Sequence, residues 1–211
     1  MKKFELTNEF ITNMFGTKLF RIRALVEFGD VEAGELGGYV EKESNLGHDD
    51  NAWVYDNAWV YGDARVYDNA WVYGDAQVSG DARVYGDAQV SGNALVCGNA
   101  LVYDNAWVYG NALVCGDARV CGNGDYAYAH GFGSVNRTTT FFRLKDGGVG
   151  VRCGCFYGTL AQFRDKIRET HGESAIAEEY LDLAALMEKR FRRTGTEDRR
   201  RKLRRMFITQ N

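Results

Sequence analysis

Residues 51–123 contain a six-residue unit that repeats twelve times without interruption, beginning AWVYDN AWVYGD ARVYDN. A valine occurs at every sixth position from Val54 to Val120, and an alanine precedes each valine by two residues. A fixed short period is typical of solenoids, in which each unit buries its apolar face against its neighbours. This stretch therefore predicts a β-helix, and it constrains the fold more than any other feature of the chain.

The repeating unit predicts a strand followed by a corner. Alternate side chains of a strand point to opposite faces, so Ala and Val point inward and the residues beside them point outward. The Gly/Asp–Asp/Asn pair supplies a corner where positive φ is tolerated. Three such sides make one triangular coil of 18 residues, and the twelve units make about four regular coils, roughly 19 Å tall at the usual inter-strand spacing.

Residues 18 apart are expected to stack on the same side of this prism, which sorts the outward positions into three columns. The first side carries Trp53, Trp71, Gln89 and Trp107 beside Tyr55, Tyr73, Ser91 and Tyr109. The second carries Trp59, Gln77, Leu95 and Leu113 beside Tyr61, Ser79, Cys97 and Cys115. The third carries Arg65, Arg83, Leu101 and Arg119 beside Tyr67, Tyr85, Tyr103 and Cys121.

The first side gathers six large aromatic residues: Trp53, Tyr55, Trp71, Tyr73, Trp107 and Tyr109. Each can bury roughly 150–250 Å². If bare, the set would expose on the order of 1,000 Å², more than a monomeric protein normally exposes. We expect this side to be an interface, covered by self-association into a dimer or trimer or by the flanking segments. A stacking platform for a planar ligand is the alternative.

The segments outside the repeat have other patterns. Period-2 alternation at 20–24 predicts strands within residues 1–30, and the glycine-rich stretch that follows predicts an irregular N-terminal coil that caps the β-helix. After residue 123 we expect a loop, a hairpin with strands at 138–144 and 149–156, and helices at 159–170 and 174–193. The predicted domains are N-terminal strands and capping coil at 1–50, the β-helix at 51–123, a small ββαα head at 124–193 and a basic tail at 194–211.

Charge and composition limit the partners. The net charge is −3, but residues 189–211 hold ten Lys/Arg and two Asp/Glu. Such a tail is usually a solvated helix end, so nucleic acid is not an expected partner. No segment approaches the roughly 18 apolar residues of a spanning helix, and the five cysteines lack a disulfide-framework spacing. These features predict a cytoplasmic protein that does not contact membranes.

The stretch 130–140, HGFGSVNRTTT, is the most suggestive segment for ligand binding. Its two glycines would let the backbone approach a ligand closely, and its hydroxyl, amide and guanidinium groups can donate to an anion. The predicted anion-binding residues are Ser134, Asn136, Arg137, Thr138, Arg143 and Lys145. No phosphate-binding glycine motif follows a strand here, so nucleotide hydrolysis has no support.

Cysteine and histidine placement does not predict a metal site. Cys153 and Cys155 are placed on one face of a predicted strand, and His171 is the nearest histidine. A metal would need a fourth ligand at matching spacing, so small buried hydrophobic residues explain these cysteines better. Packing likewise explains Cys97 and Cys115, which stack one coil apart. We predict neither a metal nor a cofactor.

The repeat resembles the hexapeptide signature of left-handed parallel β-helices, with an aliphatic first position and a small fifth position. This resemblance implies the left hand of the helix. Many proteins with this β-helix are acyltransferases that use a histidine near a subunit interface. The histidines of this chain, His48, His130 and His171, all lie outside the repeat. A hexapeptide-repeat acyltransferase is therefore kept only as an alternative, and we do not expect an enzyme.

Longer stretches together resemble a family of uncharacterised phage and prophage hexapeptide-repeat proteins. The stretches are LFRIRALVEFGDVEAGELGGYVE before the repeat and TTFFRLKDGG, CGCFYGTLAQF and ETHG after it. The likeness spans about residues 1–190. It implies a phage or prophage origin and a place in the bacterial host cytosol, and it brings no activity.

These observations predict a non-catalytic binding protein with a mainly β fold. A rigid β-helix would present the head to a host component, either a host protein or a small anionic or nucleotide signal, in a counter-defence role. An acidic β-helix could also act as a DNA mimic. The arginine column of the third side disfavours this second alternative, because it interrupts the negative surface.

Overall fold

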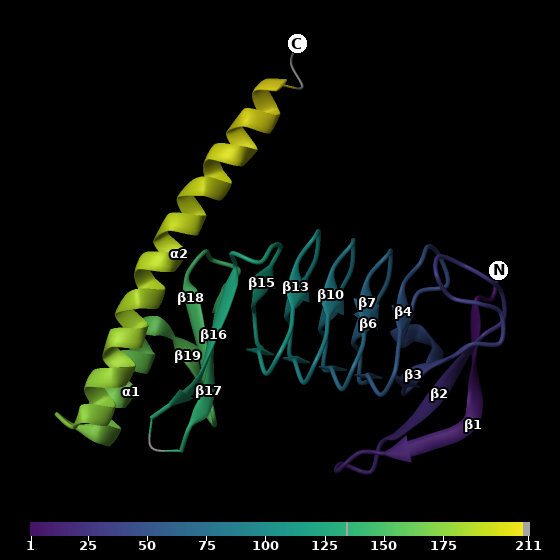
Figure 1. The fold of residues 1–211 in the computed structure, drawn as a ribbon, viewed down its shortest axis with the longest axis horizontal. Coiled ribbons are helices and arrows are strands. Elements are labelled where there is room, and N and C mark those ends of the chain that lie inside the picture. The colour runs from purple at the N-terminus through teal and green to yellow at the C-terminus, as the bar shows by residue number, and fades with distance from the viewer. Residues whose placement is uncertain (134, 209–211) are drawn as a thin grey trace.

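The computed structural model is a row of stacked coils with a strand hairpin at its N-terminal end and a helical head at its C-terminal end (Figure 1). It describes residues 1–133 and 135–208, with side chains for residues 1–133 and 135–194. The predicted fold class is confirmed: a mainly β protein with a β-helix and a small C-terminal α/β head.

The N-terminal part consists of β1 (Phe4–Thr12), β2 (Lys18–Ala24), β3 (Leu36–Val40) and a short 3-10 helix (Glu43–Asn45). The coils carry twelve two-residue strands: β4 (Trp53–Val54), β5 (Trp59–Val60), β6 (Arg65–Val66), β7 (Trp71–Val72), β8 (Gln77–Val78), β9 (Arg83–Val84), β10 (Gln89–Val90), β11 (Leu95–Val96), β12 (Leu101–Val102), β13 (Trp107–Val108), β14 (Leu113–Val114) and β15 (Arg119–Val120). The head consists of β16 (Tyr126–Phe132), β17 (Arg137–Arg143), β18 (Val149–Cys153), β19 (Phe156–Thr159), α1 (Leu160–His171) and α2 (Ala175–Ile208).

The short strands form three parallel sheets, one on each side of the prism. On the first side Trp53 is paired with Trp71, and Trp71 with Gln89. The corresponding pairs on the third side are Arg65 with Arg83 and Arg83 with Leu101. This register confirms the 18-residue coil and the sorting of outward residues into three columns.

The interior of the solenoid is a double column of alanine and valine. Every repeat alanine from Ala52 to Ala118 and every valine from Val54 to Val120 is at most 1% exposed. The corners have the predicted backbone conformation, with φ of 53° at Asp56 and 70° at Gly80. Because interior and corners are uniform, they specify the fold, and the outward columns are free to differ.

The N-terminal segment closes one end of the solenoid, as predicted. β1, β2 and β3 are antiparallel neighbours, and β3 then pairs in parallel with β5. Lys3 is buried beneath this cap, where its Nζ donates to the carbonyl oxygens of Asp49, Asp50 and Ala52. Burial lowers the pKa of Lys3 to about 8, although nearby carboxylates favour its charged form.

The head differs from the predicted ββαα unit because its sheet has four strands, in the order β16-β17-β18-β19. The stretch expected to be a loop after residue 123 is largely strand β16. Its tyrosines alternate with Ala127 and Ala129, which pack against the helical core of the head. The expected second strand ends early because Gly154, with φ of 57°, begins a turn that separates β18 from β19.

The sheet of the head caps the last coils of the solenoid. One face of β17 contacts the coils: the Thr140 hydroxyl accepts a hydrogen bond from the Leu113 amide, and Phe142 belongs to the solenoid core. The opposite face carries Phe141, which packs edge to face against Phe163 of α1. The sheet is thus buried on both faces, between the coils and the helices.

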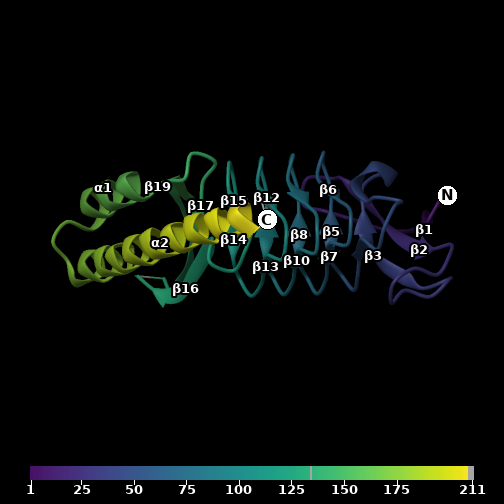
Figure 2. The ribbon, with the colours of Figure 1, turned by 90° about the horizontal axis from the view of Figure 1, so that it is seen from above.

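The long helix α2 continues well past the predicted end at residue 193 and includes most of the predicted basic tail. Its first half packs on the head, and its second half rises beyond the head in Figure 1 and lies over the last coils when seen from above in Figure 2. The sequence of α2 contains no proline, the residue that most strongly disfavours a helix interior. No helix among the described residues is long and apolar enough to cross a membrane.

Candidate functional site

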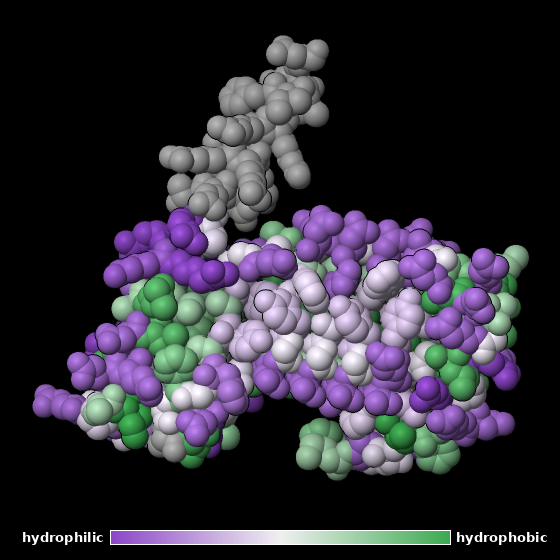
Figure 3. All heavy atoms as spheres, viewed as in Figure 1, coloured by the Kyte–Doolittle hydropathy of each residue, from purple (hydrophilic) through white to green (hydrophobic). Residues whose placement is uncertain are grey.

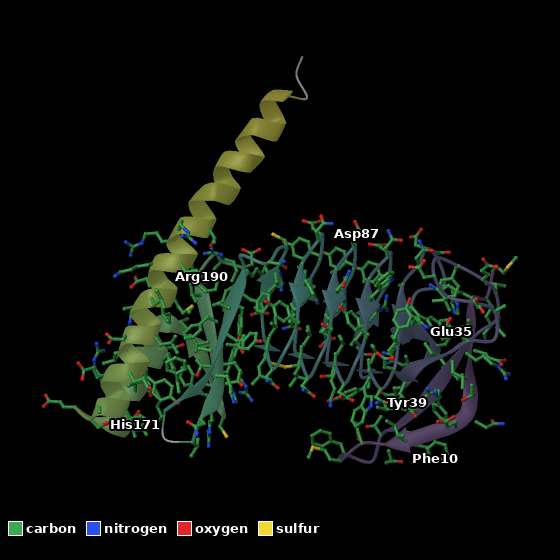
Figure 4. All side chains as sticks on the ribbon, viewed as in Figure 1. Phe10, Glu35, Tyr39, Asp87, His171 and Arg190 are labelled. Carbon is green, nitrogen blue, oxygen red and sulfur yellow. A yellow bond between two sulfur atoms is a disulfide. The ribbon has the colours of Figure 1, made fainter. Side chains whose placement is uncertain are left out.

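A cavity of about 320 Å³ opens in the head, between the β17–β18 sheet and the two helices. Its apolar wall is formed by Val135, Phe156, Phe163 and Ile167, and its polar wall by Arg137, Cys153, Cys155, Lys166, Thr170, His171 and Tyr180. Figure 4 shows His171 at the end of the head that lies away from the coils. The cavity size suits a small organic molecule.

The charge of this cavity is positive. Arg137 and Lys166 are cationic, and the Lys166 ammonium also pairs with the Glu169 carboxylate at 3.0 Å. No Asp or Glu is among the lining residues. An anion would therefore meet two cationic donors beside an apolar wall, where charge-assisted hydrogen bonds are strong.

A hydroxyl and thiol network forms the floor of the cavity. The fully buried Thr139 donates its hydroxyl hydrogen to the Cys153 sulfur at 3.1 Å, and Cys153 lies 3.9 Å from the Tyr180 hydroxyl. Burial raises the pKa of Tyr180 to about 12, and the neighbouring Cys153 adds to the effect. Tyr180 therefore remains a neutral hydrogen-bond donor at physiological pH.

Local sequence features position the cavity walls. Thr159 caps α1 by accepting a hydrogen bond from the Gln162 amide, and Gly172 ends the helix, as predicted. This fixes the helix so that its last two turns supply Lys166 and His171. His171 stacks on Tyr180 with a centroid distance of 6.0 Å. Gly154 has no side chain, which lets the Arg137 guanidinium lie directly against the backbone of the β18–β19 turn.

The structure separates the residues that were predicted to bind an anion together. Arg137 lines the cavity, but Thr138 points to the other face of β17 and is within hydrogen-bond distance of His130. Successive strand residues face opposite ways, so the expected contiguous loop does not exist. Asn136 lies in the exposed turn before β17 with φ of 49°, and Ser134 lies outside the described residues.

Arg143 and Lys145 also lie elsewhere, which corrects their predicted role in a shared anion site. Arg143 donates to the backbone oxygen of Phe191 at 2.8 Å and lies 3.8 Å from the buried Asp125 carboxylate. It therefore ties α2 to the sheet. Lys145 lines a different cavity of about 390 Å³, together with Asp117 and Asp146. Two carboxylates beside one lysine do not favour an anion.

Gly133, one of the two glycines expected to let the backbone approach a ligand, instead contacts residues of α2 in the head. A Cβ at Gly133 would lie only 2.0 Å from the Tyr180 hydroxyl. The Gly133 amide donates to the Glu179 carboxylate at 2.8 Å. These contacts hold the β16–β17 turn against α2 at the rim of the cavity.

Sequence reasoning missed Lys166 and Tyr180 as site residues. The apolar stripes of the two helices, which include Phe163, Ile167 and Tyr180, were identified and are confirmed as core. Lys166, Thr170 and His171, which lie beside the apolar stripe of α1, line the cavity. The sequence pattern of one helix cannot show which strand these polar residues will face.

The aromatic first side is partly covered by the flanking segments. Trp53 is 0% exposed because Phe4 and Phe28 pack edge to face against its ring. Its predicted place in an interface between molecules is therefore wrong. At the other end of this side, the Tyr126 and Tyr128 rings lie edge-on to Tyr109.

The rest of this side is less covered. Trp107 and Tyr109, in the last coil, are 43% and 44% exposed, and Trp71 and Tyr73 are half-buried. Tyr55 is also half-buried and packs edge to face against Trp71. In Figure 3 the coils show a pale band of intermediate hydropathy between strongly hydrophilic edges. The corner residues form those edges, and Figure 4 labels one of them, Asp87.

The remaining histidines and cysteines have structural contacts. His48 stacks on Phe4 and lies 2.9 Å from the Glu43 carboxylate, beneath the N-terminal cap. Cys97 and Cys115 are joined by a disulfide between adjacent coils, which was not predicted. No cluster of three or more potential metal ligands occurs in the part of the chain that the structure describes.

The stacked coils define a repeat protein of the β-solenoid class, here with a cavity-bearing head docked at one end. Comparison with protein families agrees with this class. The family described as YdcK beta solenoid repeat matches residues 58–74, 76–92, 88–102 and 96–110, so the chain is similar to that repeat within its coils. A comparison with curated proteins found no match.

Proposed function

We propose that this chain is a non-catalytic binding protein that captures a small organic anion in the cavity of its head. One observation carries the proposal: Arg137 and Lys166 both line a cavity that has an apolar wall and no carboxylate among its lining residues. The solenoid serves as a rigid support that is joined to the sheet of the head through backbone and side-chain contacts. A nucleotide signal fits this chemistry, because it combines a flat apolar ring with charge.

The biological setting belongs to the same proposal. The resemblance to phage and prophage proteins supports a role in the cytosol of an infected bacterium, where the protein would withhold a host signal from its receptor. To withhold the signal, the protein must bind it without converting it to a product. The acyltransferase alternative would instead use His171, the one histidine that lines the cavity.

Binding in the head predicts a specific loss in Arg137→Ala. The change removes a charged hydrogen-bond donor worth about 1.5–3 kcal/mol, so affinity for the captured anion should fall roughly ten- to a hundredfold. Differential scanning fluorimetry with a panel of nucleotides should show a stabilising shift for the wild type that is much smaller for Arg137→Ala and Lys166→Ala.

Lys145→Ala is the matched control, because Lys145 is a lysine of the head that lines a different cavity. It should keep the full shift. Ligand recovered after denaturation should be unaltered. An equal shift in Arg137→Ala and wild type would contradict the proposal, and turnover that is lost in His171→Ala would favour the acyltransferase.

We also propose that the first side mediates self-association. The observation in favour is the exposure of Trp107 and Tyr109, at 43% and 44%, at the head end of an aromatic face. Trp107 is already oriented, since its indole nitrogen donates to the Ser91 hydroxyl at 3.0 Å. Ordered aromatic side chains are typical of interface centres.

Trp107→Glu should therefore convert a dimer or trimer into a monomer, because a charge buried in an apolar contact is not solvated. Light scattering after size-exclusion chromatography measures the mass. Gln77→Glu places the same charge on the second side and should leave the assembly intact. An unchanged mass in Trp107→Glu would exclude this surface as the interface.

A further inference from the structure

The third side of the solenoid carries a column of stacked tyrosine rings. The Tyr67 and Tyr85 rings are 5.0 Å apart and nearly parallel, at 2°, and the Tyr85 and Tyr103 rings are 5.3 Å apart at 8°. The spacing follows from the coils, since each tyrosine amide donates to a valine carbonyl one coil further on. The column is thus a rigid series of aromatic planes at regular intervals.

This column is open at its Tyr67 end. The Gly47 amide donates to the Val66 carbonyl at 2.8 Å, the same bond that the Tyr67 amide makes with Val84 at 3.1 Å. Gly47 therefore occupies the next position of the tyrosine column but has no side chain to continue it. The Tyr67 ring has a tyrosine neighbour on one face. Among the described residues, no aromatic ring stacks on its other face.

A cavity of about 250 Å³ lies at this open end. It is lined by Ser44, Gly47, Arg65, Val66, Tyr67 and Arg83. The arginines are adjacent in the parallel register and both are exposed. No carboxylate lines the cavity. The nearby Asp63 is paired with Lys42 at 2.7 Å, which leaves its charge partly neutralised.

We propose that this cavity binds a planar aromatic ring that carries an anionic group, as a nucleoside monophosphate does. The ring stacks on Tyr67 as the next plane of the column, where base–aromatic stacking contributes to binding without needing a particular base. The anionic group accepts hydrogen bonds from Arg65 and Arg83, whose guanidinium groups suit phosphate. The site is separate from the cavity of the head and does not depend on it.

Isothermal titration calorimetry on the Arg137→Ala protein tests this site while the cavity of the head is impaired. AMP should bind, and adenosine and ribose 5-phosphate should each bind at least tenfold more weakly, because each keeps only one of the two recognised groups. Absence of AMP binding, or adenosine binding as tightly as AMP, would overturn the proposal.

Added substitutions in that protein locate the site. Gly47→Tyr should supply the missing ring and reduce AMP affinity at least tenfold; its Cβ would lie 3.1 Å from that of Tyr67, so circular dichroism must confirm folding. Tyr67→Leu removes the platform without adding volume near Gly47 and should cause the same loss. Tyr103→Leu, at the other end of the column, should bind AMP like its parent. Undiminished AMP binding in a folded Gly47→Tyr protein or in Tyr67→Leu would refute the site.

Discussion

Gly38→Val should destabilise the protein by at least about 3 kcal/mol and detach the N-terminal cap from the coils. A Cβ at Gly38 would lie 2.6 Å from the Ala58 carbonyl oxygen and 2.8 Å from a Val54 methyl carbon. Overpacking usually costs about 1–3 kcal/mol, and here one of the obstacles is backbone that cannot rotate away. Terminal coils protect a solenoid, so damage at the cap should spread into the coils.

Urea denaturation followed by circular dichroism measures this loss. Gly122→Val is the matched control, because a Cβ at Gly122 meets nothing within 4 Å. It should change the free energy of unfolding by less than about 1 kcal/mol. Equal stability of Gly38→Val and wild type would show that β3 does not pack on the first regular coil as described.

Arg143→Met should have the second large effect, a loss of about 3 kcal/mol from the stability of the head. Asp125 is 5% exposed, and the Arg143 guanidinium is its ion-pair partner at 3.8 Å. The same guanidinium also donates to Thr194 at 3.1 Å and to the Phe191 carbonyl. Removing one member of a buried pair leaves an uncompensated charge, which typically costs about 3–5 kcal/mol.

Chemical denaturation monitored by hydrogen exchange can assign this loss to the head. Amides of β17 and of α2 near Phe191 should exchange faster in Arg143→Met. Arg137→Ala provides the comparison, since Arg137 is an exposed arginine at the other end of the same strand. It should weaken ligand capture and leave stability nearly unchanged. The reverse pattern would mean that Arg143, and not Arg137, belongs to the binding site.

The sequence was most informative where its pattern was strictly periodic. The alanine and valine columns predicted the coils, the register and the membership of all three sides, because each unit repeats the same local conformation. The same pattern also indicated corners at residues such as Asp56 and Gly80, where positive φ is observed.

The head was less predictable because its ligand cavity depends on contacts between distant segments. The glycines of stretch 130–140 suggested a loop, whereas Ala127 and Ala129 in β16 pack against the helices and continue the sheet. Once this region is a hairpin, Arg137 and Thr138 must face opposite ways. Arg137 and Thr138 were predicted to share a site because they are adjacent in sequence, but they lie on opposite faces of β17. Nothing in the sequence indicated that Lys166 would line the same cavity as Arg137.

Trp53 illustrates the same limit within the repeat itself. Trp53 and Trp71 both stand in the tetrapeptide AWVY, but only Trp53 lies under Phe4 and Phe28. The repeat predicts that both side chains point outward. The flanking segments decide which of them remains available to a partner.

Native mass spectrometry of the protein purified from bacterial cells, followed by denaturing release of bound molecules, tests most directly whether the cavity of the head captures a small anion. Wild-type and Lys145→Ala proteins should each retain a small anionic molecule that is released chemically unchanged, and Arg137→Ala should lose it. The same bound mass on wild type and Arg137→Ala would contradict the proposed site. So would a wild-type protein that remains bare after incubation with the small-molecule extract of its host cells.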